Sequence, residues 1–177
     1  MKKSTSGFTI VELLIVVVVI GILAAIVIVA YNGITNQAKN TKTISAVNAW
    51  AKAIQLYRVE KGSFPPSNSC LGSATTYPDT GIGPYCWDTS YWEVKTAFLN
   101  QLAPYISGTP EPDNTQIGPT DFNRRGAFYH IASSTDHRIR AVFSGISTCP
   151  ASSAGPVVAT GVISSGTSGV VCQYSLE

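Results

Sequence analysis

An uncharged, apolar stretch dominates the first part of the chain. From Leu13 to Tyr31 no residue is charged and none is proline, and almost all are Leu, Ile, Val or Ala. Because a helix rises about 1.5 Å per residue, this stretch is close to the length that crosses the hydrocarbon core of a bilayer. Beyond Tyr31 the chain turns polar, like an ordinary soluble domain. The pattern therefore predicts a membrane-directed N-terminal helix that carries a globular head.

An apolar stripe on one helix face follows between Gln37 and Lys61. Its members recur at spacings of three and four residues, and they are Ile44, Val47, Ala51, Ile54 and Tyr57. Such spacing is typical of a helix that packs on a sheet. Gly62 is a stop signal, and Pro65-Pro66 prevents the helix from resuming. We therefore predict one long helix from Phe8 to Lys61, half in lipid and half on a sheet.

The remainder of the chain predicts a small antiparallel sheet. Alternating or β-branched segments between Gly-, Ser- and Thr-rich turns mark the candidate strands, which are residues 127–132, 138–144, 157–164 and 169–174. We expect an irregular connection over residues 63–93 and a short helix from Glu93 to Tyr105. The predicted fold is α+β, with three to five antiparallel strands laid on the long helix.

Composition narrows the classes of function. The 177 residues suffice for one domain with at most a small appendage. Charged residues make up 12% of the chain, well below the ~25% of soluble proteins. The net charge is +2, and Lys2 and Lys3 at the N-terminus supply two of the positive charges. These values exclude a disordered acidic tail, a coiled coil and a strongly basic nucleic-acid binder.

Two simple interpretations of the apolar segment fall short. Lys2 and Lys3 suit a secretory signal peptide, but the apolar run exceeds the usual 7–15 residues and lacks a small-x-small cleavage site. A plain membrane anchor fits the length, with the lysines on the cytoplasmic side. It does not explain Glu12, which lies inside the apolar segment.

Glu12 is the most informative residue of the chain. A carboxylate near the lipid core costs a few kcal/mol, so such residues are rare and usually paired. Either Glu12 stays at the headgroup level beside Thr9, or a cation reaches it. Cutting the chain after Gly7 would create such a cation, because it frees an α-amino group on Phe8, four residues before Glu12.

The residues around this bond resemble the leader motif of type IV prepilins. Gly7-Phe8-Thr9-Ile10-Val11-Glu12-Leu13 matches its order: a glycine, the cleaved bond, a phenylalanine, and a glutamate at the fifth residue of the product. A short basic leader precedes the motif and a long apolar helix follows it. The resemblance covers residues 1–35, and the rest of the chain supports it in general layout.

The resemblance implies how the chain is processed and assembled. A prepilin peptidase would cut between Gly7 and Phe8 and N-methylate Phe8. Residues 1–7 would then be a leader, 8–31 a transmembrane and filament-core helix, and 32–177 a pilin head. In this head the helix continues to about residue 61, a connection spans 62–120, and the sheet and C-terminal loop occupy 121–177. In a filament, Glu12 would pair with the Phe8 amine of a neighbour, which removes two costly unpaired charges.

The implied function is that of a structural subunit of a type IV pilus, a cell-surface filament for adhesion, twitching motility or DNA uptake. Its partners would be copies of itself, the prepilin peptidase, the assembly platform with its ATPase, the cytoplasmic membrane, and DNA or a host cell surface. The chain would be a single-pass membrane protein with a cytoplasmic N-terminus before it enters the extracellular filament. Alternatives are a pseudopilin of a type II secretion-like system, a minor or tip pilin, or a membrane-tethered binding domain that does not polymerise.

One departure from the family concerns the middle of the helix. Many pilins carry a proline where Val29 stands here. Without it we predict a continuous helix in the isolated subunit, with Gly21 and Asn32-Gly33 as weak points that cost up to ~1 kcal/mol each relative to alanine.

All four cysteines lie beyond the apolar segment. An even number in an exported domain indicates disulfides, and three pairings are open. We favour closure between nearest neighbours, Cys70–Cys86 and Cys149–Cys172, of which the second would enclose a C-terminal loop as in many pilins. Zinc binding is the rival interpretation, but the chain has no Cys-x-x-Cys pair and only two histidines.

Candidate chemistry is sparse elsewhere. His130, His137 and Asp136 are the only conventional acid–base set, and no nucleophile elbow or phosphate-binding glycine loop is present. We expect no enzymatic activity, no cofactor and no metal.

Arginines cluster in one part of the sequence. Four of the five lie within 17 residues, and they are Arg124, Arg125, Arg138 and Arg140. Arg138 and Arg140 should share one face of a strand. This is either a solvated strand face or a patch that binds DNA, an anionic cell envelope or the acidic side of another subunit.

Overall fold

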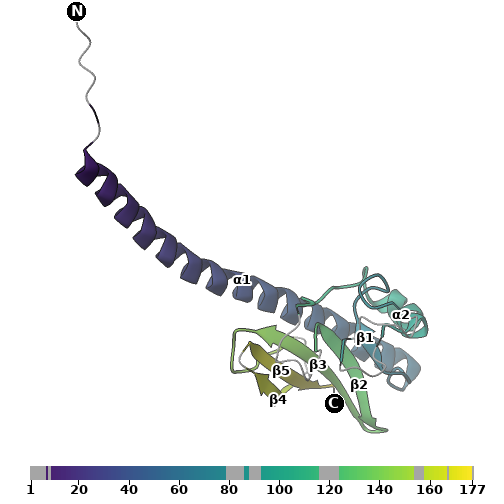
Figure 1. Ribbon diagram of the computed structural model, residues 1–177. Helices are drawn as coiled ribbons and strands as arrows, with labels where there is room; N and C mark the ends of the chain where they lie inside the picture. Colours follow the sequence, from purple (N-terminus) through teal and green to yellow (C-terminus); the bar gives the residue numbers. More distant parts are fainter. Residues whose placement is uncertain are drawn as a thin grey trace, which may run out of the picture. The chain divides into compact units, whose positions relative to one another are not determined.

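The computed structural model describes residues 7, 9–78, 86–87, 93–115, 124–153, 158–166 and 168–176. The chain divides into two compact units, residues 1–35 and residues 36–177. Helix α1 (Ile10–Lys61) contributes its first part to the N-terminal unit and its remainder to the head (Figure 1).

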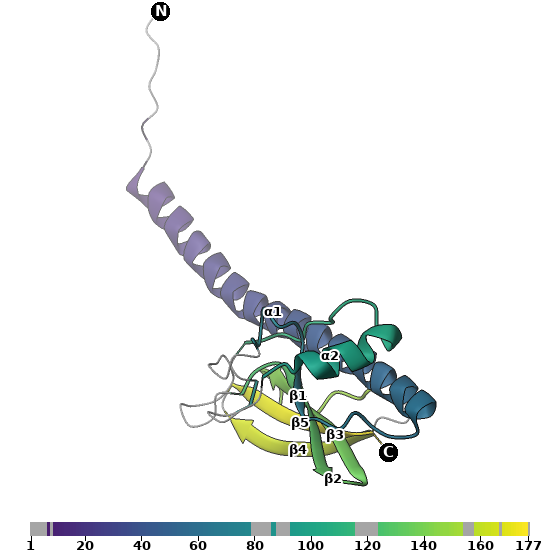
Figure 2. The same cartoon turned by 90° about the vertical axis from the view of Figure 1, so that its right-hand side faces the viewer.

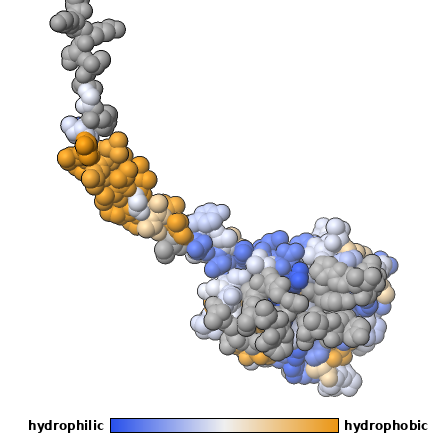
Figure 3. Space-filling model, in the orientation of Figure 1, coloured by the Kyte–Doolittle hydropathy of each residue, from blue (hydrophilic) through white to orange (hydrophobic). Residues whose placement is uncertain are grey.

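The N-terminal unit consists of the apolar part of α1. The helix continues without a break through Gly21 and through Asn32-Gly33, which confirms the prediction of a continuous helix. Its predicted start at Phe8 was wrong, because Thr9 caps the helix and the first helical residue is Ile10. Every large apolar side chain described between Ile10 and Ile28 is at least 48% exposed. Figure 3 shows this surface as an orange, hydrophobic sleeve. Because α1 is long and apolar enough here to cross a membrane, the exposed surface fits contact with lipid or with other apolar helices.

The head confirms the predicted α+β fold, with a five-stranded antiparallel sheet. The strand order is β1 (Ser69–Leu71), β2 (Ala127–Ser133), β3 (Asp136–Ser144), β5 (Gly169–Ser175) and β4 (Val158–Gly166). A short helix, α2 (Thr96–Leu102), leads into a 3-10 turn, η1 (Ala103–Tyr105). Figure 2 shows α2 and the sheet beside the second part of α1.

The main core lies between α1 and one face of the sheet, and smaller buried clusters lie on the other face. The predicted stripe is confirmed, because Val47, Ala51 and Ile54 are fully buried and Ile44 and Tyr57 pack against them. The sheet and α2 supply the other buried side chains, which include Phe98, Leu102, Tyr129, Ile139, Phe143, Cys172 and Tyr174. Each large side chain of this kind contributes roughly 1.5–3 kcal/mol by leaving water.

Side-chain amides fix α1 on the sheet. The Asn40 amide donates to Ser144 O at 2.9 Å, and Asn40 Oδ1 accepts from the Ser144 N–H at 2.8 Å. Gln55 Nε2 donates to Leu176 O at 2.6 Å near the other end of the contact. Since apolar packing alone is weakly directional, these bonds set the position of the helix along the strands.

Two predicted boundaries were wrong at the connection that precedes α2. Residues 63–93 are not wholly irregular, because they contain strand β1, and the short helix begins at Thr96 rather than Glu93. Two hydrogen bonds with strand β1 explain the later start of the helix. The Cys70 N–H donates to Glu93 O, and the Lys95 N–H donates to Ser69 Oγ, both at 3.0 Å. These bonds keep residues 93–95 extended. The helix stop is confirmed at Gly62, which has φ +74° and donates to Arg58 O at 2.8 Å.

Candidate functional site

The N-terminus of α1 is built around Thr9 and Glu12. Thr9 directly precedes Ile10, the first helical residue, and Glu12 is the third. Glu12 Oε2 accepts hydrogen bonds from the Thr9 backbone N–H at 2.8 Å and from the Thr9 hydroxyl at 2.7 Å. Thr9 Oγ1 in turn accepts one from the Glu12 N–H at 3.2 Å. This reciprocal pairing is a capping box, which satisfies N–H groups that the first helical turn leaves open.

The capping box explains how a carboxylate is tolerated at the start of an apolar helix. Thr9 gives Glu12 two donors, and the positive end of the helix dipole favours a negative charge there. Among the hydrogen bonds of the described residues, none ends on Glu12 Oε1, so one oxygen stays available to a cation from outside the chain. Thr9 is a site residue that the leader motif alone did not single out, although Thr-x-x-Glu is itself a capping signal.

Gly7 immediately precedes the bond at which cleavage is expected. It is exposed, and a Cβ built on it would have no heavy atom of the described residues within 4 Å. Packing within the described chain therefore does not require glycine here. Phe8, the expected new N-terminus and methylation site, lies outside the described residues.

Both favoured disulfides are present. Cys70 of β1 is bonded to Cys86, with 5.8 Å between the Cα atoms, and Cys149 is bonded to Cys172 of β5, with 5.5 Å. The second bond closes the segment that contains β4 and the start of β5. Each such closure stabilises a fold by roughly 3 kcal/mol, largely by restricting the unfolded chain.

Three of the four clustered arginines gather on the sheet face opposite the core. Arg138 Nη1 and Arg140 Nε both donate to Gln173 Oε1, at 3.1 and 3.0 Å. The guanidinium carbon of Arg124 lies 3.9 Å from the ring centre of Trp87, and that of Arg140 lies 5.3 Å from it. Trp87 and Gln173 were not part of the predicted patch, because no sequence pattern connects them to the arginines.

Arg125 lies apart from this group. Its backbone N–H donates to Cys86 O at 3.1 Å, and its positive charge acts to lower the pKa of the Tyr77 hydroxyl. Tyr77 is fully buried, and this burial raises the pKa of its hydroxyl well above the usual range. Among the described residues no hydrogen bond joins Arg125 to Arg138, Arg140 or Gln173, and its chain neighbour Gly126 lies against the Tyr77 hydroxyl.

The candidate acid–base residues do not converge. His137 lies on the core face of the sheet, where its ring stacks on Phe64 with 4.1 Å between the ring centres. His130 lies on the outer face, where it contacts Phe128. Burial is the main cause that lowers the pKa of both imidazoles below the ordinary value. Both side chains therefore favour the neutral form.

Acidification should destabilise the head within the titration range of histidine. An unfolded imidazole takes up a proton near pH 6.5, whereas both folded imidazoles resist it. As the pH falls from about 7.5 to about 5.5, the unfolded state therefore binds more protons than the folded state does. The free energy of unfolding, which is highest above pH 6.5, decreases over this range. Tryptophan fluorescence of the full chain in micelles should show a lower unfolding midpoint at the lower pH. His137→Phe should flatten this dependence, and an equal or higher midpoint for the parent chain at the lower pH would contradict the prediction.

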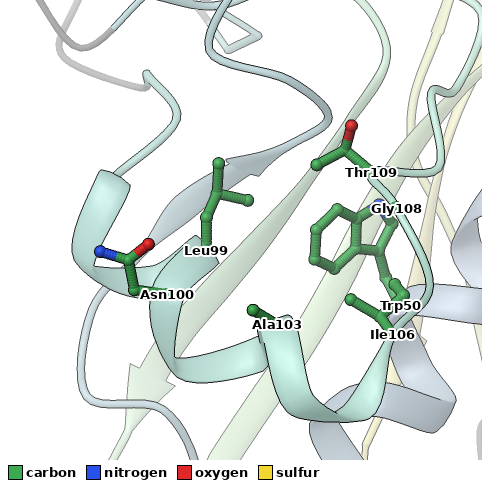
Figure 4. A pocket seen from close by; sticks show the side chains of 7 residues that line it. All are labelled: Trp50, Leu99, Asn100, Ala103, Ile106, Gly108 and Thr109. Atoms are coloured by element: carbon green, nitrogen blue, oxygen red, sulfur yellow. The ribbon is translucent and has the colours of Figure 1, made fainter.

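A shallow cleft lies between α1 and the α2–η1 segment. Its volume is about 300 Å³, and seven residues line it: Trp50, Leu99, Asn100, Ala103, Ile106, Gly108 and Thr109 (Figure 4). Trp50 is one of the lining residues and donates from Nε1 to Pro110 O at 2.9 Å. None of the lining residues is ionisable, so the cleft offers packing contacts rather than acid–base chemistry.

Comparison with known proteins agrees with the geometry at the N-terminus. The family model described as the prokaryotic N-terminal methylation motif matches residues 2–28. The chain is 31% identical over 109 residues to the type II secretion system core protein G of Pseudomonas aeruginosa, which covers 62% of this chain and 72% of that protein.

Fimbrial proteins are similar over a shorter segment. The chain is 34% identical over 76 residues to a fimbrial protein of Eikenella corrodens, covering 43% of this chain and 50% of that protein. It is 33% identical over 79 residues to a type IV major pilin of Neisseria gonorrhoeae, covering 45% and 48%. The chain thus spans about half the length of these two relatives. No solved structure matches it.

Proposed function

Because this chain belongs to the family of type IV pilins and type II secretion pseudopilins, we propose that a prepilin peptidase cuts it between Gly7 and Phe8 and methylates the new amine. The chain is a structural subunit of the pilin type. We propose further that it polymerises through α1 into an extracellular type IV pilus, using the assembly platform and ATPase of such systems, and that it performs no enzymatic reaction.

The observation that carries this proposal is the single capped carboxylate at the start of an exposed apolar helix. Cleavage after Gly7 would create a positive amine on Phe8, four residues before Glu12 in the sequence, and the described residues leave one oxygen of Glu12 without a hydrogen bond. Before assembly the apolar part of α1 would be solvated by lipid, with Lys2 and Lys3 on the cytoplasmic side. In the filament, packing against sibling helices would replace the lipid, and a neighbour's Phe8 amine would reach Glu12.

The pseudopilus is the second candidate, since the alignment with secretion protein G covers more of the chain than the two fimbrial alignments. The C-terminal region closed by the disulfide Cys149–Cys172 resembles the disulfide-bounded region of many pilins. This likeness favours assembly into a pilus over assembly into a pseudopilus.

Electron microscopy of sheared surface fibres separates these candidates. At native expression, cells should carry fibres that an antibody against the head labels along their length, and a deletion strain should lack them. Fibres that form only on overproduction would favour the pseudopilus, and label at fibre tips alone would favour a minor pilin. Protein found only in the membrane fraction would indicate a tethered domain and overturn the proposal.

A further inference from the structure

The two ends of the apolar part of α1 are marked by side chains with polar groups. Glu12 lies at one end, and Tyr31 follows it by 19 residues. Because α1 is continuous between them and rises about 1.5 Å per residue, the two residues lie about 28 Å apart along its axis. The hydrocarbon core of a bilayer is about 30 Å thick. The spacing therefore fits a helix with one of these residues at each boundary of the core.

The surface between these two residues is apolar on every side. No residue from Leu13 to Ala30 is charged, and each large apolar side chain described there is at least 48% exposed. The hydrophobic sleeve of Figure 3 corresponds to this segment. A helix that packs on one partner has a single apolar stripe, whereas lipid contacts the whole circumference. The occupant that this surface fits in the free subunit is therefore a bilayer.

Tyr31 is suited to the boundary that is nearer the head in the sequence. It is the only aromatic residue from Thr9 to Ala49, and it is 68% exposed. Tyrosine is enriched where lipid headgroups meet the hydrocarbon, because its ring is apolar and its hydroxyl is polar. The next charged residue, Lys39, lies about 12 Å further along the axis, so a span from Glu12 to Lys39 would be about 40 Å and would exceed the hydrocarbon core. Tyr31 rather than a charged residue therefore marks this boundary.

The capping box makes Glu12 suited to the opposite boundary. Thr9 supplies the two hydrogen bonds to Glu12 Oε2, and both residues are exposed. At the level of the headgroups, water solvates Oε1, which accepts no hydrogen bond from the described residues. The carboxylate then needs no cation while the helix is in the membrane. That need arises only when sibling helices replace the headgroups and the water around it.

We infer that Tyr31 is a positioning residue, which holds α1 at one depth in the bilayer with Glu12 at the opposite headgroup level. The inference rests on the membrane-bound state proposed above and adds the register of the helix within it. Gly7 lies five residues before Glu12 and stays outside the hydrocarbon core in this register. The bond that a prepilin peptidase would cut is therefore exposed to the aqueous side without withdrawal of the helix.

Fluorescence quenching by brominated phosphatidylcholine tests the register on the full chain in phosphatidylcholine vesicles. A single tryptophan replaces Val11, Ile20 or Tyr31, and the parent chain gives the background of its own tryptophans. Val11→Trp and Tyr31→Trp should be quenched at least about twofold more by bromine near the headgroup than by bromine near the chain end, and Ile20→Trp should show the reverse. Quenching of Tyr31→Trp at the depth of Ile20→Trp would overturn the inference alone. Absence of quenching in all three variants would also overturn the membrane-bound state of the proposed function.

Thiol labelling in the same vesicles tests the role of the tyrosine itself. Because all four native cysteines are in disulfides, Asn32→Cys supplies one free thiol for a membrane-impermeant maleimide. Adding Tyr31→Leu removes the anchor and extends the apolar run, so the helix should sink by about one turn and the thiol should react about fivefold more slowly. Tyr31→Trp should restore the rate, and Ile28→Leu, the matched control inside the span, should leave it within about twofold. An unchanged rate in Tyr31→Leu would overturn the inference, whether or not the chain forms fibres, because the vesicles hold no assembly machinery.

Discussion

Glu12→Gln is expected to abolish filaments while leaving the helix start intact. Glutamine is accepted at the third position of a capping box, so its side chain can still pair with Thr9. The charge is lost, and the Phe8 amine of a neighbour would then lie unpaired in an apolar core. Removing one partner of a buried ion pair costs roughly 3–5 kcal/mol, which corresponds to a loss of about two to nearly four orders of magnitude in the equilibrium constant for subunit addition. Immunoblotting of sheared fibres against whole-cell protein measures the effect.

Two further variants identify the cause of that loss. Thr9→Val removes the hydroxyl of the capping box but keeps the carboxylate, and it should reduce fibres far less than Glu12→Gln. Glu60→Gln removes a carboxylate from the exposed last part of α1 and should leave the amount of fibre unchanged. Wild-type fibre levels in Glu12→Gln would show that the carboxylate is not needed for assembly.

Trp50→Ala is expected to have the largest effect on the stability of the head. Trp50 is fully buried, packs on Phe98 with 6.1 Å between ring centres, and bonds to Pro110 O. Truncating such a side chain costs roughly 3–5 kcal/mol, because it leaves a cavity and an unsatisfied carbonyl. Chemical unfolding of the full chain in micelles, followed by the fluorescence of the remaining tryptophans, measures this loss.

The controls for Trp50 separate size from hydrogen bonding. Trp50→Phe keeps most of the ring and should cost far less than alanine. Val59→Ala changes a side chain that is 83% exposed and should alter stability by no more than about 0.5 kcal/mol. A similar cost for Val59→Ala and Trp50→Ala would contradict the assigned core.

The elements with strong periodicity were predictable from the sequence, and those set by distant contacts were not. The long helix was predictable because its apolar stretch and the one-sided apolar stripe that follows both have helical spacing, and because Gly62 marks its end. β1 is three residues long and buried throughout, so it has no alternation to read. It exists because β2 pairs with it on one side and residue 93 on the other.

The candidate sites follow the same division. Glu12 is conspicuous because a charge in an apolar segment needs an explanation, and its partner Thr9 is only three residues away. The arginines could be recognised as a cluster, but their partner Gln173 is more than thirty positions along the chain, and only the pairing of β3 with β5 brings it to them. Arg125 has the same sequence neighbourhood as Arg124, yet among the described residues no hydrogen bond joins it to Arg138, Arg140 or Gln173.

Mass spectrometry of the subunit from purified surface fibres tests the central claim most directly. We predict a polypeptide that begins at Phe8, carries one methyl group on its amine and contains both disulfides. A fibre subunit that still begins at Met1 and retains residues 1–7 would contradict the account, because no new amine would exist for Glu12 to bind.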